Sequence, residues 1–183
     1  MDKYIPEFNE KKTTEAANIL LQLNGGKMNY MKLIKLLYFV DKEAMKERER
    51  PITYDVYYSM KDGQVLSNVL DLVKDNKHGE YWHKYIERCS QYTVKLTNED
   101  IEINHLTPFE VKLIKTIFER LGKYDQFSLG KLTKRGSEYK KTESRILTPI
   151  EDIYSDLGYE PSDIIEITKD LSKKALLDTL FER

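Results

Sequence analysis

The feature that most constrains the fold is an apolar segment in the first third of the chain, Leu33–Asp41, which reads LIKLLYFVD. Hydrophobic side chains occupy nearly every position of this segment, and charged residues become frequent only after Asp41. A helix that is apolar on all sides must be buried, because any exposed face would place hydrophobic surface in water. The segment therefore predicts a central helix with the other elements packed around it.

A tyrosine-rich segment follows this helix and reads RPITYDVYYSMKDGQV. Pro51 disfavours helical geometry at the residue before it. Over residues 52–60, two sets of side chains alternate with a period of two, and Asp62-Gly63 is a turn signal. The pattern predicts one strand over residues 52–60 that ends in a tight turn.

The remaining helices are marked by caps and stops. We expect a helix over residues 14–23, ended by Gly25-Gly26, and a helix that starts at Pro108 behind a capping box of Thr107 and Glu110. A last amphipathic helix begins near residue 161, and QYTVKLTNEDIEIN predicts two short strands around TNED. The expected fold class is α+β and mostly α-helical, with a helical core around one apolar central helix and a small antiparallel β-sheet.

Composition limits the cellular setting and the function classes. The chain has 183 residues and a net charge of −1, with 30 Lys+Arg against 31 Asp+Glu. This balance argues against a dedicated nucleic-acid clamp, which is strongly basic. No apolar run approaches the roughly 20 residues that span a bilayer, and the N-terminus lacks the apolar centre of a secretory signal. With Cys89 as the single cysteine, we expect a cytoplasmic protein.

Residue patterns that carry catalysis or metal binding are not found in the sequence. His78 and His83 are five residues apart, unlike a helical zinc pair at four, and Cys89 stands six after His83. No phosphate-binding glycine loop and no Gly-x-Ser-x-Gly elbow occurs. We therefore expect no catalytic residues, no metal, no cofactor and no enzymatic activity.

Asp41, at the end of the apolar segment, admits two interpretations. It could act as a general base, but the sequence offers it no partner. Alternatively, its carboxylate accepts hydrogen bonds from the backbone of the loop at Pro51 and so ties the end of the helix to the start of the strand. We favour the second interpretation, because buried carboxylates are usually stabilised by such bonds.

The most basic segment of the chain reads KLTKRGSEYKKTESR. Basic residues with an interleaved aromatic side chain can contact nucleic acid. A solvated face, or a patch that meets an acidic protein, is favoured here by the neutral total charge. The candidate basic patch consists of Lys131, Lys134, Arg135, Lys140, Lys141 and Arg145.

Together, the apolar helix and the segment after it resemble the signature of the SocA-like, or Panacea-domain, antitoxins, which are also met as phage-associated proteins. That signature has a Leu-x-Lys-Leu-Leu-Tyr-Phe-x-Asp helix, a Gly-x-Pro-Ile turn, a Tyr-x-Ala strand end and a Gly-Pro-Val loop. The matching residues extend over about 35 positions and are Lys35, Leu36, Leu37, Tyr38, Phe39, Asp41, Pro51, Ile52, Tyr57, Gly63 and Val65. Residues 106–142 resemble the later part of the family more loosely.

The sequence departs from the family pattern at several positions. Glu49 replaces the glycine before the Pro-Ile turn, Ser59 replaces the alanine, and Gln64 replaces the proline. Lys134 stands where the family has a histidine, and Tyr139 lies near the usual tryptophan. A role carried by that histidine is not expected in this chain.

The resemblance implies a non-enzymatic bacterial or phage protein that binds and neutralises a cognate toxin. It further implies, from one kind of family member, a proteolytic adaptor that delivers the toxin to a Clp protease. Residues 1–146 would form the SocA-like domain, and residues 147–183 a C-terminal helical extension packed on it. The aromatic residues that we propose as partner contacts are Tyr54, Tyr57, Tyr58 and Trp82.

Two other functions remain open from the sequence. One is a nucleic-acid-binding regulator that uses the basic segment 131–145, and the other is a phage protein that binds a host factor. The toxin, the binding surface and the oligomeric state are not indicated by the sequence.

Overall fold

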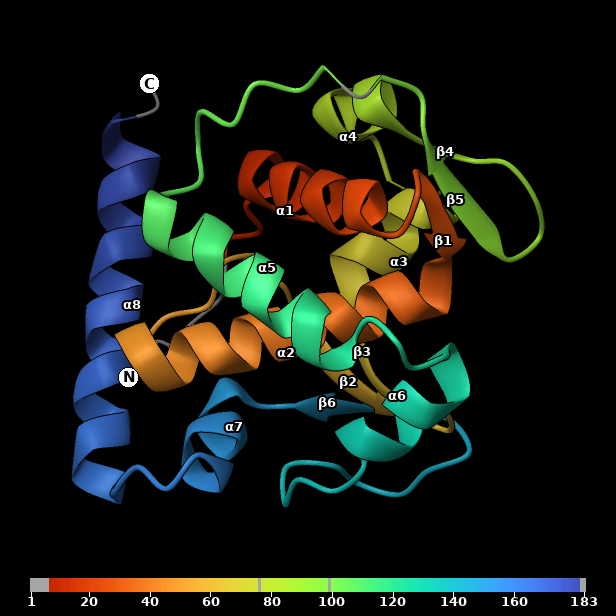
Figure 1. Cartoon of the computed structure of the whole chain (residues 1–183). Coiled ribbons are helices and arrows are strands. Elements are labelled where there is room, and N and C mark those ends of the chain that lie inside the picture. Colours follow the sequence, from red (N-terminus) through yellow and green to blue (C-terminus); the bar gives the residue numbers. More distant parts are fainter. Residues whose placement is uncertain (1–6, 76, 99, 182–183) are drawn as a thin grey trace.

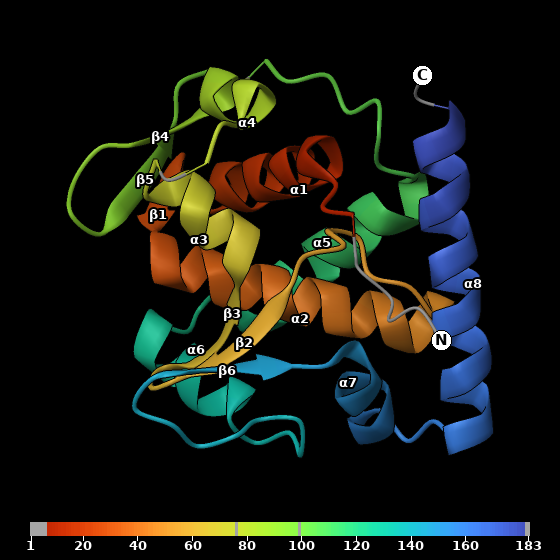
Figure 2. The same ribbon diagram turned by 180° about the vertical axis from the view of Figure 1, so that it is seen from behind.

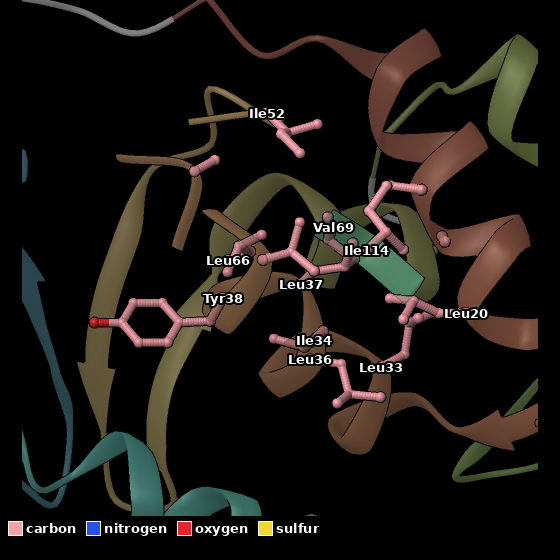
Figure 3. Packing of buried hydrophobic residues seen from close by; sticks show 14 of the residues in the cluster. Leu20, Leu33, Ile34, Leu36, Leu37, Tyr38, Ile52, Leu66, Val69 and Ile114 are labelled. Atoms are coloured by element: carbon pink, nitrogen blue, oxygen red, sulfur yellow. The ribbon is translucent and has the colours of Figure 1, made fainter. Parts of the chain in front are cut away.

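In a computed structural model of the chain, residues 7–75, 77–98 and 100–181 are described. Helix α2 (Tyr30–Arg48) runs through the middle of the molecule. Helices α1 (Glu10–Leu23), α5 (Pro108–Leu121) and α6 (Gln126–Thr133) pack against it (Figure 1). The side chains of Leu33, Ile34, Leu36 and Leu37 are fully buried (Figure 3). The prediction of a central apolar helix is confirmed.

Two three-stranded antiparallel sheets lie on different sides of α2 (Figure 2). The first has the order β1-β5-β4, from Lys27–Asn29, Thr93–Leu96 and Ile86–Arg88. The second has the order β3-β2-β6, from Gly63–Leu66, Tyr57–Met60 and Arg145–Thr148. The fold is therefore α+β and mostly helical, as predicted.

The remaining helices complete the shell around this core. Helix α3 (Ser67–Val73) follows β3, and α4 (Glu80–Tyr85) packs on α1. Helix α7 (Ile150–Asp156) reaches α2, and α8 (Pro161–Phe181) stands along one side of the molecule (Figures 1 and 2). No helix in the described part of the chain combines the length and hydropathy of a membrane span.

The predicted strand over residues 52–60 is shorter in the structure and starts only at Tyr57. The residues before it form a bend in which Tyr54 has a φ of 53°. Asp55 is turned inward at this bend and accepts hydrogen bonds from the backbone N–H groups of Val56, Asn68 and Val69. The Asp55 carboxylate therefore accepts from the first N–H groups of α3. The bend before Tyr57 is what turns this side chain toward them.

The predicted strand pair around TNED is partly wrong. Residues 93–96 do form β5, but residues 101–104 form no strand, and Glu99 of the predicted turn lies outside the described residues. Strand β5 instead pairs with β4, which precedes it. The backbone at residues 104–106 is bound by a carboxylate: buried Glu15 accepts from the N–H groups of Asn104, His105 and Leu106.

The expected boundary between residues 146 and 147 falls inside β6. This strand pairs with β2 over Arg145–Thr148, so the second sheet contains residues from both sides of the expected boundary. Helix α7 also contributes Ile153 and Tyr154 to the core, both fully buried. Residues 147–156 are thus part of the same folded unit as α2.

Candidate functional site

Asp41 lies fully buried at the point where the chain after α2 turns back along it. Its Oδ1 accepts from the N–H groups of Ile52 at 2.8 Å and Thr53 at 2.9 Å, and its Oδ2 accepts from the hydroxyl groups of Thr53 and Tyr57. The predicted tie between helix and loop is confirmed. Burial raises the pKa of Asp41 to about 6, against the opposing effect of these four donors.

The family signature residues form the interior of the molecule. Phe39 is half-buried, and the other ten are buried. Figure 3 shows Leu36, Leu37 and Tyr38 on the same helix, with Tyr38 directed away from the aliphatic cluster. There, the Tyr38 hydroxyl donates to Glu138, which also accepts from Lys42 at 2.6 Å. The signature residues therefore build a scaffold, and their spacing in this chain is explained by packing.

The turn between β2 and β3 packs closely against α6. Gly63 has a φ of 104°, and a Cβ at this position would lie 2.2 Å from Thr133 Oγ1 and 2.8 Å from the Gly130 carbonyl. Only glycine fits both the conformation and the space. Lys35, fully buried below this turn, donates to the Gln64 carbonyl at 2.6 Å. Burial lowers the pKa of Lys35 to about 7, Asp62 opposes this effect, and Lys134 adds to it.

Two departures from the family pattern contact each other and the C-terminal part of the chain. The Gln64 amide donates to Ser59 Oγ at 3.2 Å and accepts from Thr148 Oγ1 at 3.0 Å. Ser59 and Thr148 are also joined by a hydrogen bond of 3.0 Å. All three side chains are fully or almost fully buried. The polar groups introduced at positions 59 and 64 are therefore satisfied by one another and by β6.

The third departure is Glu49, which ends α2 in the left-handed conformation with a φ of 59°. This conformation favours glycine, the residue that the family has here. The Glu49 carbonyl accepts from the Tyr154 hydroxyl at 2.7 Å. Tyr159 donates to the Met45 and Lys46 carbonyls at 3.2 Å each. Residues 154–159 thus supply donors to carbonyls at the end of α2. The Met45 carbonyl also accepts from the Glu49 N–H at 2.9 Å.

The four aromatic residues proposed as partner contacts lie in different environments. Tyr57 and Trp82 are buried in the core, at 2% and 1% exposure, so these two serve packing and not an exposed contact surface. Tyr54 lines a groove of about 350 Å³ beside α8, with Lys174 over its ring at 4.7 Å. Tyr58 is half-buried beneath the guanidinium of Arg145, 3.6 Å from the ring centroid.

The six residues of the candidate basic patch are all exposed, but they are divided over two neighbourhoods. Lys131 and Lys134 lie beside Lys35 at the edge of α6. Lys140 pairs with Asp152 at 3.3 Å, and Arg145 donates to Ser67 while it stacks on Tyr58. Part of the positive charge is therefore used within the chain.

The sequence predicts an amphipathic helix from near residue 161, with an apolar stripe that continues to Leu180. In the structure, the second half of α8 instead carries exposed apolar side chains. Ile164, Ile167 and Leu171 are buried against the molecule. The exposed side chains are Ile165 at 50%, Leu176 at 62%, Leu177 at 51%, Leu180 at 61% and Phe181 at 82%. We call Leu176, Leu177, Leu180 and Phe181 the outer face of α8. At about 100° per residue, Leu176, Leu177 and Leu180 point away from the buried stripe, and Phe181 lies at its flank. Leu176 and Leu180, and Leu177 and Phe181, are pairs at i and i+4, which indicates a shared apolar face but not whether the rest of the fold covers it.

Among the described residues, no group of three or more His, Cys, Asp and Glu side chains is placed to hold a metal ion. Three of the buried carboxylates, those of Asp41, Asp55 and Glu15, accept from backbone N–H groups. Buried Glu138 instead accepts from the Tyr38 hydroxyl and from Lys42. Cys89 is exposed at the end of β4. The polar interior therefore organises loops and helix ends.

Comparison with known proteins gives one finding on the family and two negative results. Residues 33–140, more than half of the chain, match the family model described as antitoxin SocA-like, Panacea domain. No curated protein and no solved structure matches the chain. The match covers α2 through α6 and ends before β6, α7 and α8.

Proposed function

Because the chain belongs to the SocA-like antitoxin family, we propose that it neutralises a toxin by direct binding and that the outer face of α8 contacts this toxin. The family membership supports an antitoxin-type role. The toxin would be a protein encoded beside this chain. The observation that carries the proposal is the match over residues 33–140.

The outer face of α8 supports the choice of surface. Four large apolar side chains gather within six residues and are each at least half exposed. Contiguous exposed apolar surface of this kind usually marks a site of interaction. The face also lies outside the residues that match the family. Since family members neutralise unrelated toxins, contacts specific to one toxin are expected on elements that the family does not share.

Neutralisation can proceed by occlusion alone or with delivery of the toxin to a Clp protease. In occlusion, an interface of roughly 800 Å² on this chain covers the active surface of the toxin. In delivery, the bound toxin is in addition degraded. The two modes differ in the lifetime of the toxin in cells that lack the protease. Family membership is the support for the second mode.

The test is co-expression with the product of each neighbouring gene, followed by co-purification. We expect one product to be toxic alone, harmless with this chain, and stably bound to it. Leu177→Lys combined with Leu180→Lys should abolish both rescue and co-purification. Leu23→Lys, at another exposed leucine at the end of α1, should leave both intact.

Two outcomes would contradict the proposal. If no neighbouring gene product is toxic alone, the antitoxin function is not supported. If rescue persists in the Leu177→Lys, Leu180→Lys variant, the toxin binds elsewhere. The half-life of the toxin then distinguishes the two modes: an equal half-life in cells with and without the Clp protease would show that neutralisation proceeds by occlusion alone.

A further inference from the structure

A small pocket lies between α2, α6 and the turn that joins β2 to β3. Its volume is about 150 Å³, and its walls include Met31, Lys35, Asp62, Phe127, Lys131 and Lys134. A pocket for a whole drug-sized molecule is larger, about 300–1,000 Å³. This pocket instead has room for a few water molecules or for one small polar group.

The charges around the pocket are unequal. Three lysines line it, Lys35, Lys131 and Lys134, against one acidic residue, Asp62. In the described part of the chain, Lys131 and Lys134 take part in no ion pair within 4 Å, and both side chains are exposed. The pKa of Asp125, at the start of α6, is lowered by hydrogen bonds from within the helix and also by the charge of nearby Lys131. The residues that line the pocket nevertheless include three lysines and one acidic residue.

Lys35 is the unusual member of this group, because a lysine is almost never fully buried without a charged partner. Its ammonium group donates to the Gln64 carbonyl at 2.6 Å, although an ammonium has three donor positions. Asp62 is too far away to form an ion pair with it but is near enough to favour the charged form. In its protonated form, which predominates below a pH of about 7, Lys35 stabilises an anion nearby, since screening by water is weak there.

The geometry points to a binding site for one oxyanion group, a carboxylate or a phosphate, held by Lys131 and Lys134 at the rim and by the charge of Lys35 below. Lysine ammonium groups form charge-assisted hydrogen bonds to both kinds of oxyanion. Phe127, 68% exposed at the same rim, offers an apolar contact to whatever carries the group. This inference does not depend on the toxin, since α6 and α8 lie on different sides of the molecule (Figures 1 and 2).

The experiment is a titration of the full chain with sodium acetate, and separately with inorganic phosphate, at constant ionic strength set with sodium chloride. Binding is followed by the NMR signals of the lysine side chains. We expect saturable shifts at Lys35, Lys131 and Lys134, and an increase in the pKa of Lys35 by about one or more, as an added counter-charge produces. Saturation by phosphate alone supports the site and assigns it to phosphate.

The matched variants are Lys131→Gln with Lys134→Gln, and Lys140→Gln with Lys141→Gln. Both remove two positive charges, but only the first pair lines the pocket. The first pair should weaken binding by at least about tenfold, the equivalent of one charge-assisted hydrogen bond. Equal weakening in both pairs, or no saturable shift with either anion, would overturn the inference. The melting temperature of each variant verifies that it is folded.

Discussion

The signature region and the second half of α8 use their hydrophobic residues in opposite ways. In the signature region, α2 and residues 51–65, large apolar side chains are buried, and polar side chains such as Asp41 find partners inside. On the outer face of α8, apolar side chains of similar size face the solvent. The contrast teaches that the residues within the family match build the scaffold, while exposed apolar surface gathers on a helix outside that match.

The strongest test of this comparison removes the C-terminal part at the expected boundary. A chain that ends at residue 146 loses Thr148 from the buried Ser59–Gln64 network and loses the two tyrosine hydroxyls bound to the end of α2. We expect it to lose cooperative folding, because several buried polar groups are left without partners at about 1–3 kcal/mol each. A chain that ends at residue 175 is the control and should melt near the full-length temperature. Circular dichroism melts distinguish the two outcomes.

The next test concerns the charge of Asp41. Its pKa in the folded protein, about 6, lies above the ordinary 3.8. The folded state therefore holds the proton more tightly, and the contribution of Asp41 to the free energy of unfolding is present below pH 4 and decreases between about pH 4 and 6. The difference between the folded pKa of about 6 and the ordinary 3.8 corresponds to about 3 kcal/mol in the free energy of unfolding.

In Asp41→Asn, this decrease is absent. Between pH 4 and pH 6, the free energy of unfolding of the variant should rise relative to that of the unmodified chain. Above pH 6, the difference between the two should be constant. Urea denaturation at four pH values measures this. Parallel stability curves for the two proteins would show that Asp41 keeps an ordinary pKa.

Removal of the Asp41 carboxylate should cost about 1–3 kcal/mol at pH 7, because the N–H groups of Ile52 and Thr53 lose their acceptor. Asp41→Ala tests this by equilibrium unfolding and by toxin neutralisation in the same preparation. We expect stability to decrease before neutralisation is lost. An unchanged melting temperature with lost neutralisation would instead make Asp41 a functional residue.

A smaller effect is expected at the junction between the family-matched part and the C-terminal part. Tyr154→Phe removes the hydroxyl that binds the Glu49 carbonyl. The loss should be about 1 kcal/mol, the net value of one hydrogen bond. Tyr124→Phe, at an exposed tyrosine, is the control and should be neutral. Equal unfolding free energies for both variants would show that α7 contributes nothing to the end of α2.

The smallest change in stability is expected on the outer face of α8. Leu177→Lys exchanges one exposed side chain for another and should alter the free energy of unfolding by no more than about 0.5 kcal/mol. A loss of more than about 2 kcal/mol would show that the outer face is packed against something in the folded chain. That result would remove the contrast with the signature region.

The sequence predicted the parts of the fold that depend on local patterns. The burial of α2 follows from an apolar run, and the capping box of Thr107 and Glu110 is present as expected from their spacing. The bond from Asp41 to the loop was predicted from the position of the residue at a helix end before Pro51.

The features that were missed depend on tertiary contacts. The strand starts late because Asp55 is drawn to the N-terminus of α3, and period-two alternation does not reveal this. Trp82 is buried although aromatic residues are also common at interfaces. Helical spacing does not reveal that Leu177 and Phe181 are exposed. Which turns of α8 are covered depends on where the other elements of the fold end.

The bonds from Tyr154 and Tyr159 to the end of α2 also bear on how the protein is made. Synthesis proceeds from the N-terminus, and most chains fold progressively as they emerge. Here the second helix of the chain receives its final hydrogen-bond donors from residues more than 100 positions later. The central helix therefore cannot reach its final, fully bonded state on a ribosome that has released only its first 150 residues. A molecule cut short before residue 154 would lack both tyrosine donors, and with them the completed end of the central helix.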